Sequence, residues 1–280
     1  MKTGLVLEGG GMRGIYVAGV LDVFMEQELG FDGVIGNSAG AIHGCSFISN
    51  QKGRSLRYYR NYCGDYRFMS FRSLITTGDL VGVEFCYHEL PEKLDIFDNE
   101  AFRQNPTPFY VVCTNLETGK AEYPRITDMS VQIDLLRASA SMPYVSRIVE
   151  VDGKKYLDGG CSDSIPVQAF RDMGYTRNVV VLTRPADYRK KPEFSGLAKI
   201  VYRKYPAFAE ALDHRYLSYN QTAEAILDME KKDEIFVIRP EKDLEIGRIE
   251  KNPMSVERVY NTGREDALKR MEALKRWMKQ

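Results

Sequence analysis

Long apolar stretches, paired cysteines and net charge are what this 280-residue sequence lacks. No apolar run approaches the roughly 20 residues that a membrane-spanning helix needs. The 39 basic and 39 acidic residues cancel, so a global basic field for nucleic acid is absent. The first nine residues lack the apolar stretch of a secretory signal. We therefore expect a cytoplasmic protein with no nucleic-acid partner, and contact with a membrane surface stays open.

Cysteine and histidine are both scarce. The five cysteines are odd in number, widely spaced, and never form a C-x-x-C pair: Cys45, Cys63, Cys86, Cys113 and Cys161. This pattern predicts free thiols in a reducing compartment rather than a disulfide scaffold or a structural zinc site.

Apolar periodicity indicates an α/β fold. A short apolar run at residues 5–7 precedes helical patterning over 15–29, and a second run at 31–35 precedes a small-residue helix over 39–48. This alternation predicts a parallel sheet with helices on its faces. Other expected elements are strands at 108–113, 178–182 and 235–238, a hairpin at 149–157, and helices over 133–139, 196–229 and 255–278, the last interrupted near Gly263.

A glycine-rich loop follows the first strand. It reads Gly9-Gly10-Gly11-Met12-Arg13-Gly14. Glycines allow a tight turn, and the amides at the start of the next helix have no partner within it. Such a loop can hold a phosphate or a developing oxyanion. It also fits the dinucleotide pattern G-x-G-x-x-G, but that fold expects an acidic residue at the end of the second strand, where none stands.

A nucleophile pattern, G-x-S-x-G, ends the second strand as Gly36-Asn37-Ser38-Ala39-Gly40. A serine at a strand-to-helix junction sits in a sharp turn that projects its hydroxyl, and small neighbours relieve the crowding. The helix N-terminus behind it favours negative charge on a reacting oxygen. A plain turn, with Ser38 as a helix cap, is the alternative.

A third motif, Asp158-Gly159-Gly160, ends another short strand. Partial burial would raise the basicity of this carboxylate, so it could accept a serine proton. Alone, it reads as an ordinary Asp-Gly turn. Together, the three motifs supply a nucleophile, a base and an oxyanion loop.

In order and spacing, these motifs resemble the patatin-like phospholipase family, whose pattern is G-G-G-x-R/K-G, then G-x-S-x-G, then D-G-G or D-G-A. Ala138-Ser139-Ala140-Ser141-Met142-Pro143 is similar to the small-residue segment before the family's aspartate. The likeness spans residues 5–185, and the remainder resembles bacterial members with an added helical region. We expect a catalytic core over 4–185 and a mainly helical extension over 186–280 packed on it, together forming one domain.

The resemblance implies a three-layer α/β/α fold with a mainly parallel central sheet. It also implies a lipid acyl-ester hydrolase of the phospholipase A or lysophospholipase kind, with neither a metal nor an organic cofactor, working through a Ser–Asp dyad and an acyl-serine intermediate. Position by position, Ser38 is the nucleophile and Asp158 the base. Gly9 to Gly14 form the oxyanion loop, which Arg13 holds in place.

Three other functions stay open. A Ser–His–Asp esterase would need a histidine after Asp158, and only His214 qualifies, in a polar helical stretch that favours a surface position. A nucleotide-binding module would use the glycine loop. A lipid-binding scaffold with an inactive site is the third.

Two segments have ambiguous patterns. Residues 51–72 interleave six basic residues with aromatics and one acid, which fits either an anionic membrane surface or a solvated helix with snorkelling arginines. Aromatic and basic residues from Phe194 to Tyr219 could cover the site or simply pack.

Overall fold

The computed structural model describes residues 1–192 and 196–280, so Phe194 lies outside the described residues. The strands are β1 (Thr3–Leu7), β2 (Gly33–Gly36), β3 (Phe109–Val111), β4 (Cys113–Asn115), β5 (Ala121–Glu122), β6 (Arg125–Ile126), β7 (Val149–Val151), β8 (Lys154–Asp158), β9 (Arg177–Val181) and β10 (Ile235–Ile238). The α-helices are α1 (Ile15–Glu26), α2 (Ala39–Ile48), α3 (Arg54–Tyr62), α4 (Phe71–Thr77), α5 (Asn99–Gln104), α6 (Met129–Ser139), α7 (Val167–Asp172), α8 (Leu197–Val201), α9 (Pro206–Lys231) and α10 (Pro253–Met278). Two short 3-10 helices are η1 (Gly11–Gly14) and η3 (Gly159–Cys161), and η2 (Phe85–Leu94) is a π-helix.

The central sheet has six strands in the order β10-β9-β1-β2-β3-β6. All neighbours are parallel except β3 and β6. Leu5, Val6 and Leu7 of β1 are fully buried, as expected for a strand covered by helices on both faces. The predicted mainly parallel sheet is confirmed, and the carboxyl ends of β1 and β2 lie side by side at one edge.

A second, antiparallel sheet has the order β5-β4-β8-β7. The segment expected as one strand at 108–113 divides at Val112, whose amide donates to the Gly36 carbonyl (3.1 Å) before the chain passes into β4. The predicted hairpin is confirmed as β7 and β8. Its turn residues Asp152 and Gly153 have φ of 51° and 74°, as a tight hairpin turn requires.

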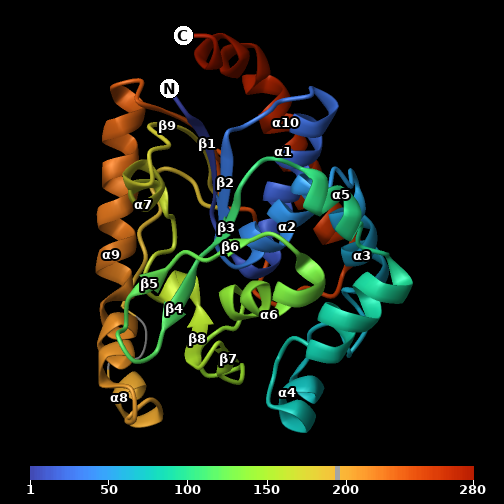
Figure 1. The fold of residues 1–280 in the computed structure, drawn as a ribbon, viewed down its shortest axis with the longest axis vertical. Helices are drawn as coiled ribbons and strands as arrows, with labels where there is room; N and C mark the ends of the chain where they lie inside the picture. Colours follow the sequence, from blue (N-terminus) through green and yellow to red (C-terminus); the bar gives the residue numbers. More distant parts are fainter. Residues whose placement is uncertain (193–195) are drawn as a thin grey trace.

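Helices cover both faces of the central sheet (Figure 1). Helices α1, α2 and α10 lie on one side, and α7 and α9 on the other. An apolar cluster lies between the sheet and each helix layer. One cluster includes residues of α1, α2 and α10, and the other includes residues of α7 and α9. This arrangement is the expected α/β/α fold. The boundary at 185/186 stays a prediction.

Helices α1 and α10 cross at two glycines. A Cβ on Gly19 would lie 2.1 Å from the carbonyl oxygen of Tyr260, and one on Gly263 would lie 2.1 Å from that of Tyr16. The prediction that α10 is interrupted near Gly263 is wrong, because the helix is continuous from Pro253 to Met278. Gly263 serves close backbone approach rather than a break.

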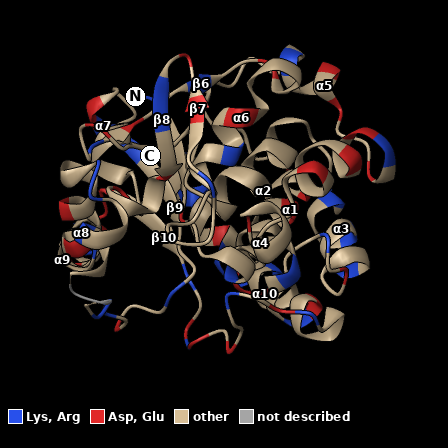
Figure 2. Cartoon of the chain, turned by 90° about the horizontal axis from the view of Figure 1, so that it is seen from below, with Lys and Arg blue, Asp and Glu red and all other residues tan. Residues whose placement is uncertain are grey.

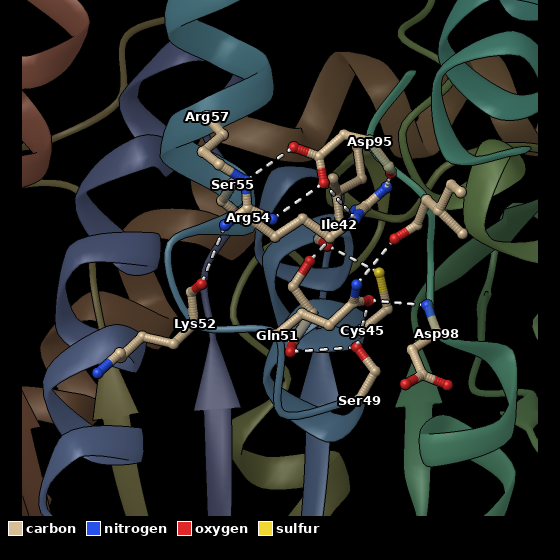
Figure 3. Close-up of polar contacts among 12 residues, drawn as sticks. Ile42, Cys45, Ser49, Gln51, Lys52, Arg54, Ser55, Arg57, Asp95 and Asp98 are labelled. Atoms are coloured by element: carbon tan, nitrogen blue, oxygen red, sulfur yellow. Dashed lines mark hydrogen bonds and ion pairs between the residues drawn. The ribbon is translucent and has the colours of Figure 1, made fainter. Parts of the chain in front are cut away.

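The basic and aromatic segment at 51–72 does not present a free basic patch. Figure 3 shows Arg54 and Arg57 converging on Asp95. The Arg54 side chain is only 5% exposed and lies 3.5 Å from an Asp95 carboxylate oxygen, while Arg57 contacts the same carboxylate at 3.1 Å. Farther along, Arg67 pairs with Asp65 and Glu89. Most of these cations are therefore neutralised within the fold.

None of the helices in the described part of the chain is long and apolar enough to span a membrane. All five cysteines are free thiols, and four are buried.

Candidate active site

Ser38 occupies the turn between β2 and α2. Its φ of 53° and ψ of −123° lie in a sparsely populated region, where strain marks functional turns. The turn requires small neighbours, since a Cβ on Gly36 would lie 2.7 Å from Ala41, and one on Gly40 would lie 2.6 Å from the carbonyl oxygens of Leu7 and Glu8. The sequence motif thus has the strained geometry of a nucleophile turn.

The glycine-rich loop lies directly beside this turn. A Cβ on Gly9 would lie 2.8 Å from the Ser38 Cβ, and one on Gly14 would lie 2.4 Å from the Ala39 Cβ. Gly11 has a φ of 57°, and the Met12 side chain is fully buried. Within residues 1–192 and 196–280, no protein group accepts a hydrogen bond from the amides of Gly10 or Gly11. These amides are available to a ligand oxygen.

Asp158 ends β8 and is 5% exposed. Its carboxylate accepts a hydrogen bond from the Gly160 amide (2.7 Å) and lines the same cavity as Ser38. Burial raises the pKa of Asp158 above its usual range, while the Arg215 cation, the Ser38 hydroxyl and the Gly160 amide oppose the rise. Gly159 permits a close approach to Val112, whose carbonyl oxygen would lie 2.3 Å from a Cβ there. The structure thus brings together the three predicted motifs.

The short segment from Ser139 to Ser141 holds the backbones of both Ser38 and Asp158. The Ser38 amide donates to the Ser139 hydroxyl (3.0 Å), and the Asp158 amide donates to the Ser141 carbonyl (2.8 Å). Sequence reasoning noted this segment only as similar to a family feature. The position of this segment shortly before Asp158 was the only feature of the sequence that pointed to it, and that position does not predict the two hydrogen bonds.

The glycine loop has anchors that sequence reasoning missed. Thr183 donates its amide to the Glu8 carboxylate (2.6 Å) and its hydroxyl to the Gly9 carbonyl (3.0 Å). Tyr219 donates to the other oxygen of Glu8 (2.8 Å). Arg13 is part of the loop itself, and its buried Nε makes no hydrogen bond. Its predicted holding role stays a prediction.

Arg215 belongs to the segment that we expected either to cover the site or to pack, and it lines the cationic cavity beside Asp158. Its Nε donates to the Gly160 carbonyl. Arg215 comes from α9, so a helix of the C-terminal region contacts the aspartate loop.

Two cavities meet at Ser38. The first, of about 380 Å³, is largely apolar and runs between α2, α3, η2 and α6; its lining includes Ile42, Tyr59, Phe68, Leu136 and Met142. The second, of about 340 Å³, contains Asp158, the glycine loop and five basic residues: Arg13, Arg184, Lys190, Arg215 and Arg248. Gly11, Ser38 and Met142 line both. A serine hydroxyl therefore stands where an apolar and a cationic space join.

Two of the three histidines, His43 and His214, lie outside both cavities, whereas His88 of η2 lines the apolar cavity. His43 is buried on α2 and pairs through Nδ1 with the Ser55 hydroxyl (3.0 Å). Burial lowers the pKa of His43 to about 3, so its ring is neutral. His214 is exposed, and its Nδ1 lies 3.0 Å from the Glu210 carbonyl of the same helix. His214 lines neither cavity at Ser38.

No cluster of three or more histidine, cysteine or acidic side chains that could hold a metal ion occurs among the described residues.

The sequence is similar to several known proteins. It is 30% identical over 249 residues to an uncharacterized protein, YjjU, of Escherichia coli, covering 87% of this chain and 70% of that protein. It is 27% identical to an uncharacterized NTE family protein of Mycobacterium tuberculosis and 26% identical to lysophospholipase NTE1 of Saccharomyces cerevisiae. Those matches cover 59% and 74% of this chain, but only 44% and 12% of the two relatives.

Among solved structures, VipD from Legionella pneumophila aligns over 97% of this chain and 67% of its own, with 13% identity and a TM-score of 0.47.

Two family models match the chain. One, described as a domain of unknown function, matches residues 205–279. The other, described as patatin-like phospholipase, matches residues 5–171, which include the glycine loop, Ser38 and Asp158. The chain therefore belongs to the patatin-like phospholipase family, a family of hydrolases acting on lipid ester bonds.

Proposed function

We propose that this protein is a serine acyl-ester hydrolase of the phospholipase A or lysophospholipase kind, working through a Ser38–Asp158 dyad. One observation carries the proposal: a strained serine and a buried carboxylate line the same cavity beside loop amides that have no acceptor in the described chain. A nucleophile, a base and an oxyanion site are what acyl transfer requires.

The chemistry runs in two halves. Ser38 Oγ attacks the ester carbonyl carbon, Asp158 takes the hydroxyl proton, and the amides near Gly10 and Gly11 stabilise the oxyanion. Collapse breaks the ester bond; the leaving alcohol takes the proton from Asp158, and an acyl-serine remains. Asp158 then deprotonates a water molecule that attacks this acyl group. The fatty acid leaves, and the proton returns to Ser38 Oγ.

The two cavities support a lipid substrate with an anionic head group. The apolar cavity suits an acyl chain, because burying methylene groups away from water is favourable. In the other cavity, five cations face two carboxylates, Glu8 and Asp158, which both have partners of their own. Arg184 already pairs with Asp243. Basic side chains outnumber acidic ones in the lining of this cavity, which favours a phosphate-bearing substrate over a neutral glyceride.

The rival functions have less support. A Ser–His–Asp triad would need His214 at Asp158, yet His214 is exposed on α9 and bonded within its own helix. A nucleotide-binding module would not explain why the glycine loop packs directly against Ser38. The presence of both Ser38 and Asp158 in the lining of one cavity speaks against a scaffold with an inactive site. The predicted cytoplasmic location and the absence of a nucleic-acid partner stay predictions.

The test is labelling with a fluorophosphonate probe, together with hydrolysis of p-nitrophenyl butyrate. We expect the wild type to label and turn over, Ser38→Ala to do neither, and Asp158→Asn to fold, by circular dichroism, without turnover. A substrate panel then compares a lysophospholipid with the monoacylglycerol of the same chain. Unchanged hydrolysis by Ser38→Ala would rule the proposal out.

A further inference from the structure

Three segments lie at the cationic cavity or next to it. They are residues 71–79 at α4, residues 142–148 after α6, and residues 196–205 at α8, and we name them together the docking rim. Phe71 and Tyr144 line the cavity itself. Hydrogen bonds join the segments: Arg147 donates its amide to Asp79 (2.8 Å), and Tyr144 donates its amide to the Tyr202 hydroxyl (2.7 Å). The rim is therefore one continuous structure at the entrance to Ser38.

Large apolar side chains are concentrated on this rim. Of the sixteen that are exposed in the described part of the chain, seven lie on these 26 residues: Phe71, Ile75, Tyr144, Ile148, Leu197, Ile200 and Val201. Ile75 is 85% exposed and Ile200 73%. Single exposed apolar residues need no explanation, but a cluster around a lipid site marks an interaction surface.

The rim is also cationic. Its residues include five basic side chains (Arg72, Arg147, Lys199, Arg203 and Lys204) and one acidic side chain, Asp79, which gives a net charge of +4 in a chain whose total is zero. All five basic residues are exposed. In Figure 1, α4, β7 and α8 lie at the same, lower end of the molecule, and Figure 2 looks onto that end. Apolar side chains among surface cations match an anionic bilayer surface.

We propose that the docking rim binds the surface of anionic lipid bilayers and places the mouth of the Ser38 cavity against the membrane. The apolar residues of α4 and α8 enter the boundary between head groups and acyl chains, while the rim cations contact anionic head groups. A substrate lipid can then pass from the bilayer into the cavities without its chain crossing water.

The experiment uses the full chain carrying Ser38→Ala, so that binding is measured without hydrolysis. Sedimentation with sucrose-loaded vesicles compares pure phosphatidylcholine with a mixture that includes phosphatidylglycerol. We expect binding to the anionic vesicles that weakens as salt is raised. Adding Ile75→Ser and Ile200→Ser should lower the partition coefficient at least about tenfold, because two large apolar side chains no longer enter the lipid.

Leu268→Ser is the matched control, since Leu268 is a half-exposed residue on α10 outside the rim. It should bind vesicles like its parent. In the active enzyme, Ile75→Ser with Ile200→Ser should leave hydrolysis of soluble p-nitrophenyl butyrate unchanged, because neither residue lines the cavities. Equal binding to both kinds of vesicle, or a rim variant that binds like the control, would overturn the proposal. A dimer in solution that the rim substitutions dissociate would also overturn it and assign the surface to a second copy.

Discussion

The Ser139 hydroxyl accepts a hydrogen bond from the Ser38 amide at 3.0 Å, although Ser139 ends α6 and Ser38 follows β2. Two residues on, the Ser141 carbonyl accepts the Asp158 amide. The distance between nucleophile and base thus depends on a segment with no part in the proposed proton transfer. Ser139 is a positioning residue in our proposal.

Ser139→Ala should lower kcat roughly tenfold or more and leave KM nearly unchanged. The substitution leaves a buried Ser38 amide without its partner, which costs about 1–3 kcal/mol, and about 1.4 kcal/mol corresponds to a factor of ten in rate. Ser141→Ala is the control, because its contact with Asp158 uses the backbone carbonyl. Steady-state kinetics on p-nitrophenyl butyrate measure both; equal effects of the two substitutions would contradict the assignment.

Arg215→Gln should move the acidic limb of the pH–rate profile to higher pH. Asp158 must be deprotonated to act as a base, and its pKa is already raised by burial. Arg215 gives the largest opposing contribution, so its removal raises the pKa of Asp158 further and activity is lost at a higher pH. The measurement is kcat/KM of a neutral ester against pH. Arg215→Lys keeps the charge and should shift the profile less; identical shifts would mean that the hydrogen bond to Gly160, not the charge, matters.

Gly263→Ala should destabilise the protein by about 1–3 kcal/mol, although alanine favours helices. The added methyl would meet the Tyr16 carbonyl at 2.1 Å, and this overpacking outweighs the helix gain of up to about 1 kcal/mol. Gly30→Ala is the control, because nothing lies within 4 Å of its Cβ position. Urea unfolding would show the difference; a stabilised Gly263→Ala protein would refute the close crossing of α1 and α10.

Asp95→Asn should destabilise the fold by about 3 kcal/mol, because it leaves the buried Arg54 cation without its carboxylate (Figure 3). Arg57→Gln removes a half-exposed partner of the same carboxylate and should cost at most about 1 kcal/mol. Guanidinium titration compares the two variants. Similar losses in both would show that Arg54 does not depend on Asp95.

The sequence predicted much of the central layer correctly because local patterns determine it. Apolar runs ending in glycine marked β1 and β2, and both strands are parallel as expected. The motifs around Ser38 and Asp158 were recognisable because a strained turn admits few residue types. The residue types at those few positions were therefore enough to predict that the motifs lie close together in the fold.

The rest depends on contacts between distant parts of the chain. The Thr183 amide holds the Glu8 carboxylate from 175 residues away, and no local pattern reports such a contact. Likewise, Gly263 looks like a helix breaker when neighbours in sequence are considered, and only the nearby α1 backbone explains it. Only the β7–β8 hairpin of the antiparallel sheet was predicted, because its other strands, β4 and β5, have just three and two residues.

Strand β10 pairs with β9 along its length, and β9 leads directly to Thr183. A shortened protein that stops at residue 185 would leave the outer side of β9 unpaired and the crossing face of α1 uncovered. Such a fragment would tend to aggregate through its open strand. Attempts to isolate a minimal enzyme should therefore retain both β10 and α10.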